Sequence, residues 1–146
     1  PTVSTMMRIA DALEETLSGF FMNIDEGKSS PIETSKETPN ISSKDGLCEL
    51  SILGAGETVS WLQWYVLTMK PKGKLPSKSH GSNTFENITV ISGEVVVHLK
   101  KQSETLKAGD TFRFPTNQEH TLMNKSKTIS KVLMVNYIDP INGSFD

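Results

Sequence analysis

The chain has 146 residues, which is enough for one ordinary domain with a small appendage. Its 15 basic and 17 acidic side chains give a formal net charge of −2, so the composition does not indicate a surface for nucleic acid or anionic membrane. The single Cys48 cannot form an internal disulfide, which favours a reducing, cytoplasmic setting. No signal peptide is expected from this N-terminal sequence, and the sequence contains no apolar run of the roughly 18 residues that span a bilayer.

Residues 2–22 carry the apolar spacing of a helix. Met6, Ile9, Ala10 and Leu13 lie three or four residues apart, which places them on one helical face. The end of the same segment predicts a second, shorter helix. Two helices this short cannot bury both apolar faces against each other, so we expect them to pack against a further partner.

Residues 23–45 have the composition of a linker. They are rich in Ser, Thr, Lys, Glu, Asn and Pro, and their apolar content is too low for independent folding. An edge strand over part of this segment is the alternative.

Residues 46–140 predict one antiparallel β domain. The strand-forming runs are 47–52, 61–69, 88–91, 94–99, 111–114 and 132–137. Gly93 and Gly109 mark tight turns between them, because glycine supplies the positive φ that such turns need. Residues 70–79 are expected to form a basic, proline-containing loop. Short strands at this spacing predict a barrel or jelly roll, here preceded by the two short α-helices.

Two glycine-containing motifs in this domain resemble those of the cupin superfamily. In the first, His80, Glu86 and Gly93 match the family in residue type and spacing, while Gly73 lies one residue further upstream than usual. The second motif is matched by four residues: Gly109, Pro115, His120 and Asn124. The resemblance covers about fifty residues and implies the double-stranded β-helix fold, which hosts many functions.

The cupin motifs imply a candidate metal site with one ligand missing. Family members that keep all four ligands hold a divalent metal with three histidines and one glutamate. Ser82 replaces the second histidine here, which leaves His80, Glu86 and His120, and Asn117 replaces the glycine of the proline turn. Zinc, iron, nickel and manganese accept such a set. We favour a polar ligand pocket without metal and keep a metal centre as the alternative.

A ligand pocket also needs apolar walls. Phe112 and Phe114 share one strand face, Ile88 continues the face that Glu86 starts, and Leu122 follows His120 on its own face. Trp64 is a further candidate. Each of these taken singly is equally compatible with an ordinary core residue. The third histidine, His98, should lie on the opposite face from Val97 and Leu99, so we expect it at the solvent or at a dimer edge.

Residues 1–22 resemble the last two helices of the helix-turn-helix domain in lambda-repressor-like (XRE-type) bacterial regulators. That family has a proline, small hydroxyl residues and an apolar helix, followed by a serine and a Leu-x-x-Phe-Phe helix. Residues 1–13 and 17–21 follow this pattern. The resemblance implies that 1–22 is the remnant of a DNA-binding domain, 23–45 a linker and 46–140 a sensor. The first residue is Pro1, so we expect a fragment of a longer product.

Together these patterns predict the sensor part of a helix-turn-helix plus cupin transcriptional regulator that is not an enzyme. The expected partners are a small-molecule effector, DNA through the missing N-terminal domain, and a second copy in a homodimer, with no membrane. The alternative is a small metal-dependent cupin enzyme, a dioxygenase or isomerase, that uses His80, Glu86 and His120. The absent second histidine and the helical lead-in argue against the enzyme.

Overall fold

The computed structural model describes residues 31–54, 56–58, 61–77 and 84–138. The helices predicted within residues 2–22, most of the predicted linker, and both His80 and Ser82 lie outside the described residues. Within the described ranges, no helix is long and apolar enough to cross a membrane.

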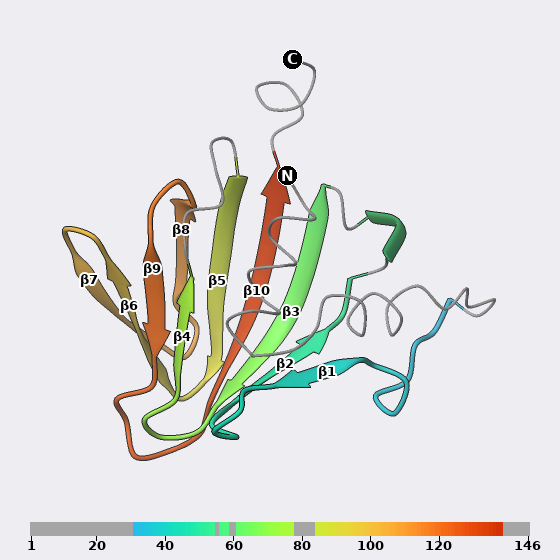
Figure 1. Ribbon diagram of the computed structural model, residues 1–146, viewed down its shortest axis with the longest axis horizontal. Helices are drawn as coiled ribbons and strands as arrows, with labels where there is room; N and C mark the ends of the chain where they lie inside the picture. Colours follow the sequence, from blue (N-terminus) through green and yellow to red (C-terminus); the bar gives the residue numbers. More distant parts are fainter. Residues whose placement is uncertain (1–30, 55, 59–60, 78–83, 139–146) are drawn as a thin grey trace.

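The described chain forms ten strands and one short 3₁₀ helix, η1 (Gly56–Thr58). The strands are β1 (Asn40–Ser42), β2 (Cys48–Ile52), β3 (Leu62–Met69), β4 (Lys74–Ser77), β5 (Thr84–Ser92), β6 (Glu94–Leu99), β7 (Ser103–Lys107), β8 (Thr111–Pro115), β9 (His120–Met123) and β10 (Ser130–Ile138). They build a six-stranded sheet in the order β1-β2-β3-β10-β5-β8 and a four-stranded sheet in the order β4-β9-β6-β7 (Figure 1). All pairings are antiparallel, as predicted.

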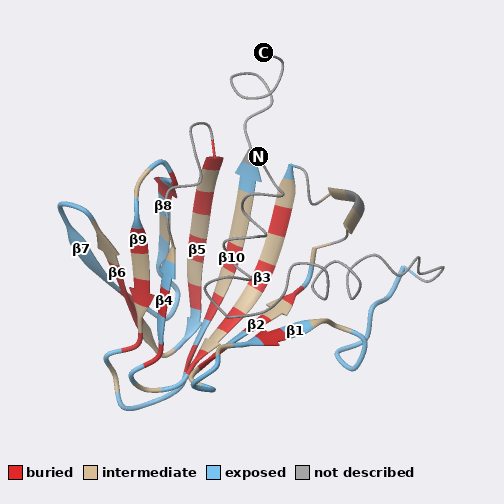
Figure 2. Ribbon diagram, viewed as in Figure 1, coloured by how far each residue is buried: buried red, intermediate tan, exposed pale blue. Residues whose placement is uncertain are grey.

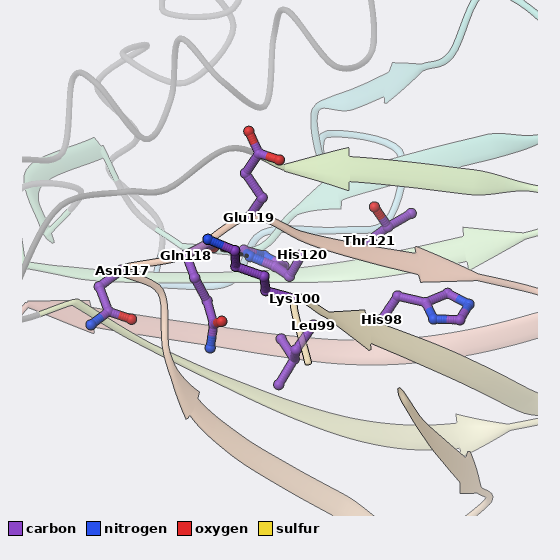
Figure 3. Close-up of a pocket in the computed structure, with 8 residues that line it drawn as sticks. All are labelled: His98, Leu99, Lys100, Asn117, Gln118, Glu119, His120 and Thr121. Carbon is purple, nitrogen blue, oxygen red and sulfur yellow. Dashed lines mark hydrogen bonds between the residues drawn. The ribbon is translucent and has the colours of Figure 1, made fainter. Parts of the chain in front are cut away.

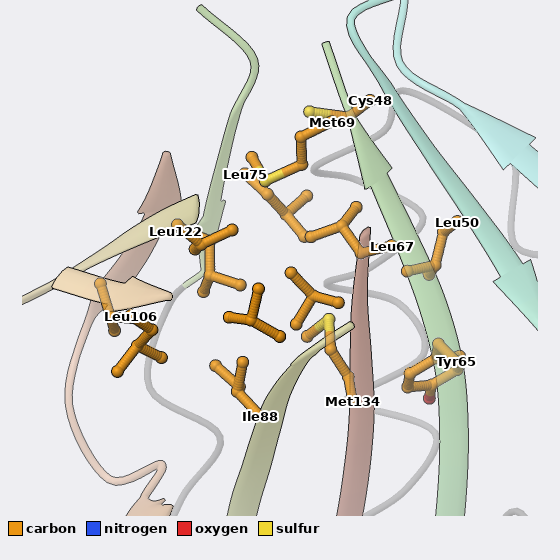
Figure 4. Packing of buried hydrophobic residues seen from close by; sticks show 14 of the residues in the cluster. Cys48, Leu50, Tyr65, Leu67, Met69, Leu75, Ile88, Leu106, Leu122 and Met134 are labelled. Carbon is orange, nitrogen blue, oxygen red and sulfur yellow. The ribbon is translucent and has the colours of Figure 1, made fainter. Parts of the chain in front are cut away.

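Strict alternation along the strands separates an inward face from an outward face. Buried positions recur at every second residue of β3 and β5, as Figure 2 shows. Tyr65, Leu67, Ile88, Val97 and Leu122 are all fully buried. Such side chains from both sheets point toward one another between the layers (Figure 4). This shared apolar interior holds the two sheets together, since burial of apolar surface contributes about 25 cal/mol per Å².

The predicted glycine turns are present, and one of them has no room for a side chain. Gly93 has φ +78° and Gly109 has φ +92°. A Cβ on Gly93 would lie 2.7 Å from Ser130 Oγ, whereas a Cβ on Gly109 would have no atom within 4 Å. Gly73 has a different reason to be glycine, because its Cβ would lie 2.9 Å from the carbonyl oxygen of Lys70.

Two strands, β4 and β7, differ from the sequence prediction. β1 lies inside the predicted linker and forms the edge of the six-stranded sheet, where it pairs with β2, so the alternative of an edge strand within 23–45 is the one present. β4 lies inside the predicted loop 70–79; its Pro76 is tolerated because β4 is the edge strand of the other sheet. β7 was not predicted, because most of its side chains are exposed and polar.

Candidate functional site

Glu86 and His120 meet inside the barrel, although they come from different sheets. Glu86 is on β5 and His120 opens β9, and both lie at inward strand positions. Their side chains are 1% and 2% exposed, and Glu86 Oε2 lies 3.2 Å from His120 Nε2. The structure therefore brings together two of the three residues that the cupin motifs imply for the candidate site.

The other ring nitrogen of His120 fixes the orientation of the imidazole. Nδ1 lies 3.2 Å from the carbonyl oxygen of Gln118, and because a carbonyl can only accept, Nδ1–H donates this hydrogen bond. Nε2 is therefore the nitrogen that faces the carboxylate. It either shares a proton with Glu86 or offers a lone pair toward the interior.

Two amide side chains continue the polar surface across the six-stranded sheet. In the strand register Asn136 on β10 lies directly between Gln63 on β3 and Glu86 on β5. Directly opposed residues share a face, so these three side chains, which we call the polar row, all point inward. The sequence reasoning did not identify Gln63 or Asn136 as members of the site.

Tyr65 supports the polar row from the next inward position of β3. Its hydroxyl donates to Gln63 Oε1 at 2.6 Å. Burial raises the pKa of the Tyr65 phenol well above its usual value, and the nearby Glu86 carboxylate raises it further. The phenol is consequently neutral at physiological pH and acts as a donor that holds the Gln63 amide in place.

Aromatic rings form one wall beside His120. Phe114 packs edge-on against the imidazole with ring centroids 5.1 Å apart, and it stacks on Phe112 at the same centroid distance. Beyond Glu86, the hydroxyls of Thr84 and Thr116 are hydrogen-bonded to each other. The site thus combines a carboxylate and an imidazole with neutral polar groups and an aromatic face.

The remaining predicted wall residues divide between the two faces. Ile88 and Leu122 are fully buried on the inward face, two residues after Glu86 and His120 respectively. Trp64 is not part of this group: it lies on the outward face of β3, because its neighbours Gln63 and Tyr65 point inward. His98 also lies on an outward face, as expected, opposite Thr121 of β9.

A surface pocket of about 580 Å³ lies next to His120. It is lined by residues 98–100 at the end of β6 and by residues 117–121 around the start of β9. In Figure 3 Asn117 and Gln118 lie at one end of the pocket, and His98 and Thr121 lie at the other. His120 takes part in both regions, since it lines this pocket while its Nε2 faces Glu86.

The described residues of the candidate metal site have the ligand chemistry and spacing that fit a cation, but they supply too few ligands to complete the site. Two ligand atoms that each lie about 2.1 Å from one zinc ion are roughly 3 to 3.5 Å apart, and the separation of Glu86 Oε2 from His120 Nε2 is 3.2 Å. The bond from Nδ1 to a backbone carbonyl is also the arrangement that orients metal-binding histidines. Among the described residues, however, no three His, Cys, Asp or Glu side chains cluster, and His80 lies outside them.

Two buried acceptor atoms at this site lack hydrogen bonds. Glu86 Oε1 and Asn136 Oδ1 are shielded from solvent and have no hydrogen-bond partner among the described residues. Buried polar groups are nearly always paired, so each of these atoms calls for a specific occupant or a specific role. A polar residue at an inward position two residues after a buried apolar residue, as Asn136 is after Met134, is the sequence signal for such a role.

Comparison with known proteins identifies the fold. Residues 65–136 match the Cupin domain family (Cupin_2). No curated protein sequence matches the chain. The cupin domain of an XRE family transcriptional regulator from Enterobacter cloacae superposes with a TM-score of 0.60 at 18% identity, over 64% of this chain and 98% of that one.

Two further structures extend the comparison. An HTH_3 family transcriptional regulator from Vibrio cholerae has a TM-score of 0.64 at 22% identity, over 95% of this chain and 73% of that one. A predicted oxalate decarboxylase from Thermotoga maritima has a TM-score of 0.61 at 22% identity, over 74% and 99%. At such identities the likeness shows the fold alone. The family match agrees with the two packed sheets and the buried Glu86–His120 pair that the structure shows. The chain therefore contains a cupin domain, matched over residues 65–136.

Proposed function

We propose that this chain is the sensor part of a transcriptional regulator whose cupin domain controls an N-terminal helix-turn-helix domain. The observation that carries the proposal is the likeness to the HTH_3 family regulator over 95% of the chain, which is more than the cupin match alone covers. The cupin domain of the XRE family regulator supports it from a second structure. Both fit the resemblance of residues 1–22 to the final helices of such a DNA-binding domain.

The sensor would work through the polar interior of the barrel. A small molecule or ion that binds beside Glu86 and His120 would favour one arrangement of the domain over another, because a ligand shifts a conformational equilibrium by its differential affinity. In a cytoplasmic homodimer this shift would change the spacing of two DNA-reading heads. Half-sites one helical turn apart would then be bound more or less tightly.

The protein encoded by the complete gene tests this proposal. We expect selection from random or genomic DNA to enrich one palindromic sequence, bound at least a thousandfold more tightly than unrelated DNA. Fluorescence anisotropy with the enriched site, with and without a panel of metabolites and metal ions, then measures the coupling. Binding to every DNA with equal affinity would argue against a regulator, and Glu86→Gln should reduce the effector response while leaving the DNA sequence preference intact.

A metal-dependent cupin enzyme is the second candidate, and the Glu86–His120 geometry is the observation that favours it. Among the similar structures are the predicted oxalate decarboxylase and a sugar phosphate isomerase from Silicibacter pomeroyi. A bound divalent metal would supply Lewis-acid chemistry, and here Glu86 and His120 would hold it. Stoichiometric iron, zinc, nickel or manganese in protein purified without chelators, lost in His120→Ala, would favour the enzyme; a metal content far below one ion per chain in both proteins would count against it.

A further inference from the structure

The polar row contains one carboxylate, that of Glu86, and two buried side-chain oxygens that lack a hydrogen bond among the described residues. Glu86 Oε1 and Asn136 Oδ1 are both buried and unpaired among the described residues. The two residues are direct register partners on β5 and β10, so their side chains start from neighbouring points on the same face. One ligand group placed in the polar row would therefore lie beside both residues.

The third member of the polar row does not compete for that ligand group. Gln63 Oε1 already accepts the hydrogen bond from Tyr65, and the raised pKa of the phenol keeps this donor protonated. The polar row thus has one acceptor that is occupied and two that are not.

Among the described residues, no buried lysine or arginine supplies a fixed positive charge that would pair with an anion. The buried polar and charged side chains of the described residues include Glu86 and His120, but no lysine or arginine. Lys100 borders the surface pocket and is exposed. A carboxylate or phosphate placed against Glu86 would meet like charge and acceptor oxygens, which is unfavourable in a site shielded from water.

We infer that the polar row recognises a positively charged ligand group, which donates to or coordinates Glu86 Oε1 and Asn136 Oδ1, with Asn136 as a residue that determines specificity. An organic ammonium group and a divalent metal ion share this chemistry. The inference rests on the proposed sensor function and specifies the class of its effector. The apolar part of an organic cation would lie against Phe114, which is the register partner of Glu86 on β8 and whose ring also attracts cations.

Thermal unfolding of the 146-residue chain with matched probes tests the inference. Butylammonium and butyrate have the same chain length and opposite charge, oxalate is a second anion, and zinc chloride is the metal; sodium chloride equalises ionic strength. We expect a cationic probe to raise the melting temperature by about 3 °C or more at saturating concentration, and the two anions to leave it unchanged. The cation that acts, ammonium or zinc, identifies the source.

Variants of Asn136 connect the response to the polar row. Asn136→Leu should weaken binding of the effective cation about tenfold or more, because a hydrogen bond to a charged group is lost. Asn136→Asp should strengthen it. The control Ser92→Asp adds the same charge at an exposed position at the far end of β5 and should not change cation affinity. Since Asn136→Leu also removes an unpaired buried acceptor, the ligand-free variant should melt no lower than the parent protein.

Three results would overturn the inference: stabilisation by an anion and not by a cation, a cation response that Asn136→Leu does not weaken, or no response to any probe. Stabilisation by butyrate or oxalate would leave a sensor with an anionic effector, so the proposed function would survive. Conversely, cation binding by a complete protein that shows no preference among DNA sequences would uphold the inference and refute the regulator.

Discussion

Breaking the buried pair of Glu86 and His120 should have asymmetric effects on stability. In His120→Leu the carboxylate loses the contact from Oε2, while Oε1 already has no hydrogen-bond partner among the described residues. Removal of one partner from a buried pair costs about 3–5 kcal/mol, and the edge-on contact with Phe114 adds up to about 1 kcal/mol. Glu86→Leu should cost less, about 1–2 kcal/mol, because it also removes the unpaired Oε1 atom.

The double variant carries the decisive comparison. When both polar partners are replaced by leucine, no buried charge remains, and such replacements are often close to neutral. We therefore expect Glu86→Leu to restore about 3 kcal/mol or more to the His120→Leu protein. Urea unfolding followed by circular dichroism gives the four free energies of unfolding at pH 7.

An exposed carboxylate provides the control for this cycle. Glu49→Leu removes a negative charge from the outward face of β2 and should change the free energy of unfolding by less than about 0.5 kcal/mol. If the two leucine substitutions at the buried pair are additive within about 0.5 kcal/mol, Glu86 and His120 do not interact and the reasoning is refuted.

Three other substitutions test the frame of the barrel. Gly93→Ala should lower the free energy of unfolding by at least about 2 kcal/mol, because the added Cβ would collide with Ser130. Gly109→Ala should lower it by only about 1–2 kcal/mol, because the positive φ is unfavourable there but the space is open. Equal losses of the two variants in chemical denaturation would contradict the steric argument. Asn124→Ala should cost about 2–3 kcal/mol, since the Asn124 amide donates to the carbonyls of Met69 and Thr128 at 2.9 and 2.8 Å. Burial raises the pKa of the Cys48 thiol from 9.0 to about 11. At pH 8 this depletes the thiolate about a hundredfold, so Cys48 should react with a thiol reagent at least a hundredfold more slowly than in urea, and comparable rates would contradict this.

The strands and their inward faces were predictable because alternation is a local property of the sequence. The run 94–99 was predicted with the boundaries that β6 has, and the inward positions of Glu86, Ile88 and Leu122 followed from counting every second residue. β4 and β7 were missed for a physical reason. Edge strands need little apolar content, and β4 even contains a proline, so neither has a strong strand pattern.

The candidate site was only partly predictable, because sequence motifs identify single residues, whereas the strand register determines which residues lie side by side. Glu86 and His120 stand in the motifs and do meet. Gln63 and Asn136 belong to no motif, and only the pairing of β3, β10 and β5 brings them beside Glu86. Trp64 was a candidate wall residue, but strand alternation places it on the outward face.

The central claim is that occupancy of the barrel interior controls DNA binding, and one measurement tests it most directly. The affinity of the complete protein for its selected DNA site would be measured by anisotropy with and without the effector, in the parent protein and in Glu86→Gln. We expect the effector to change the DNA dissociation constant about fivefold or more in the parent protein, and this change to disappear in the variant. An effector that binds the barrel while the DNA dissociation constant stays the same in both proteins would contradict the account.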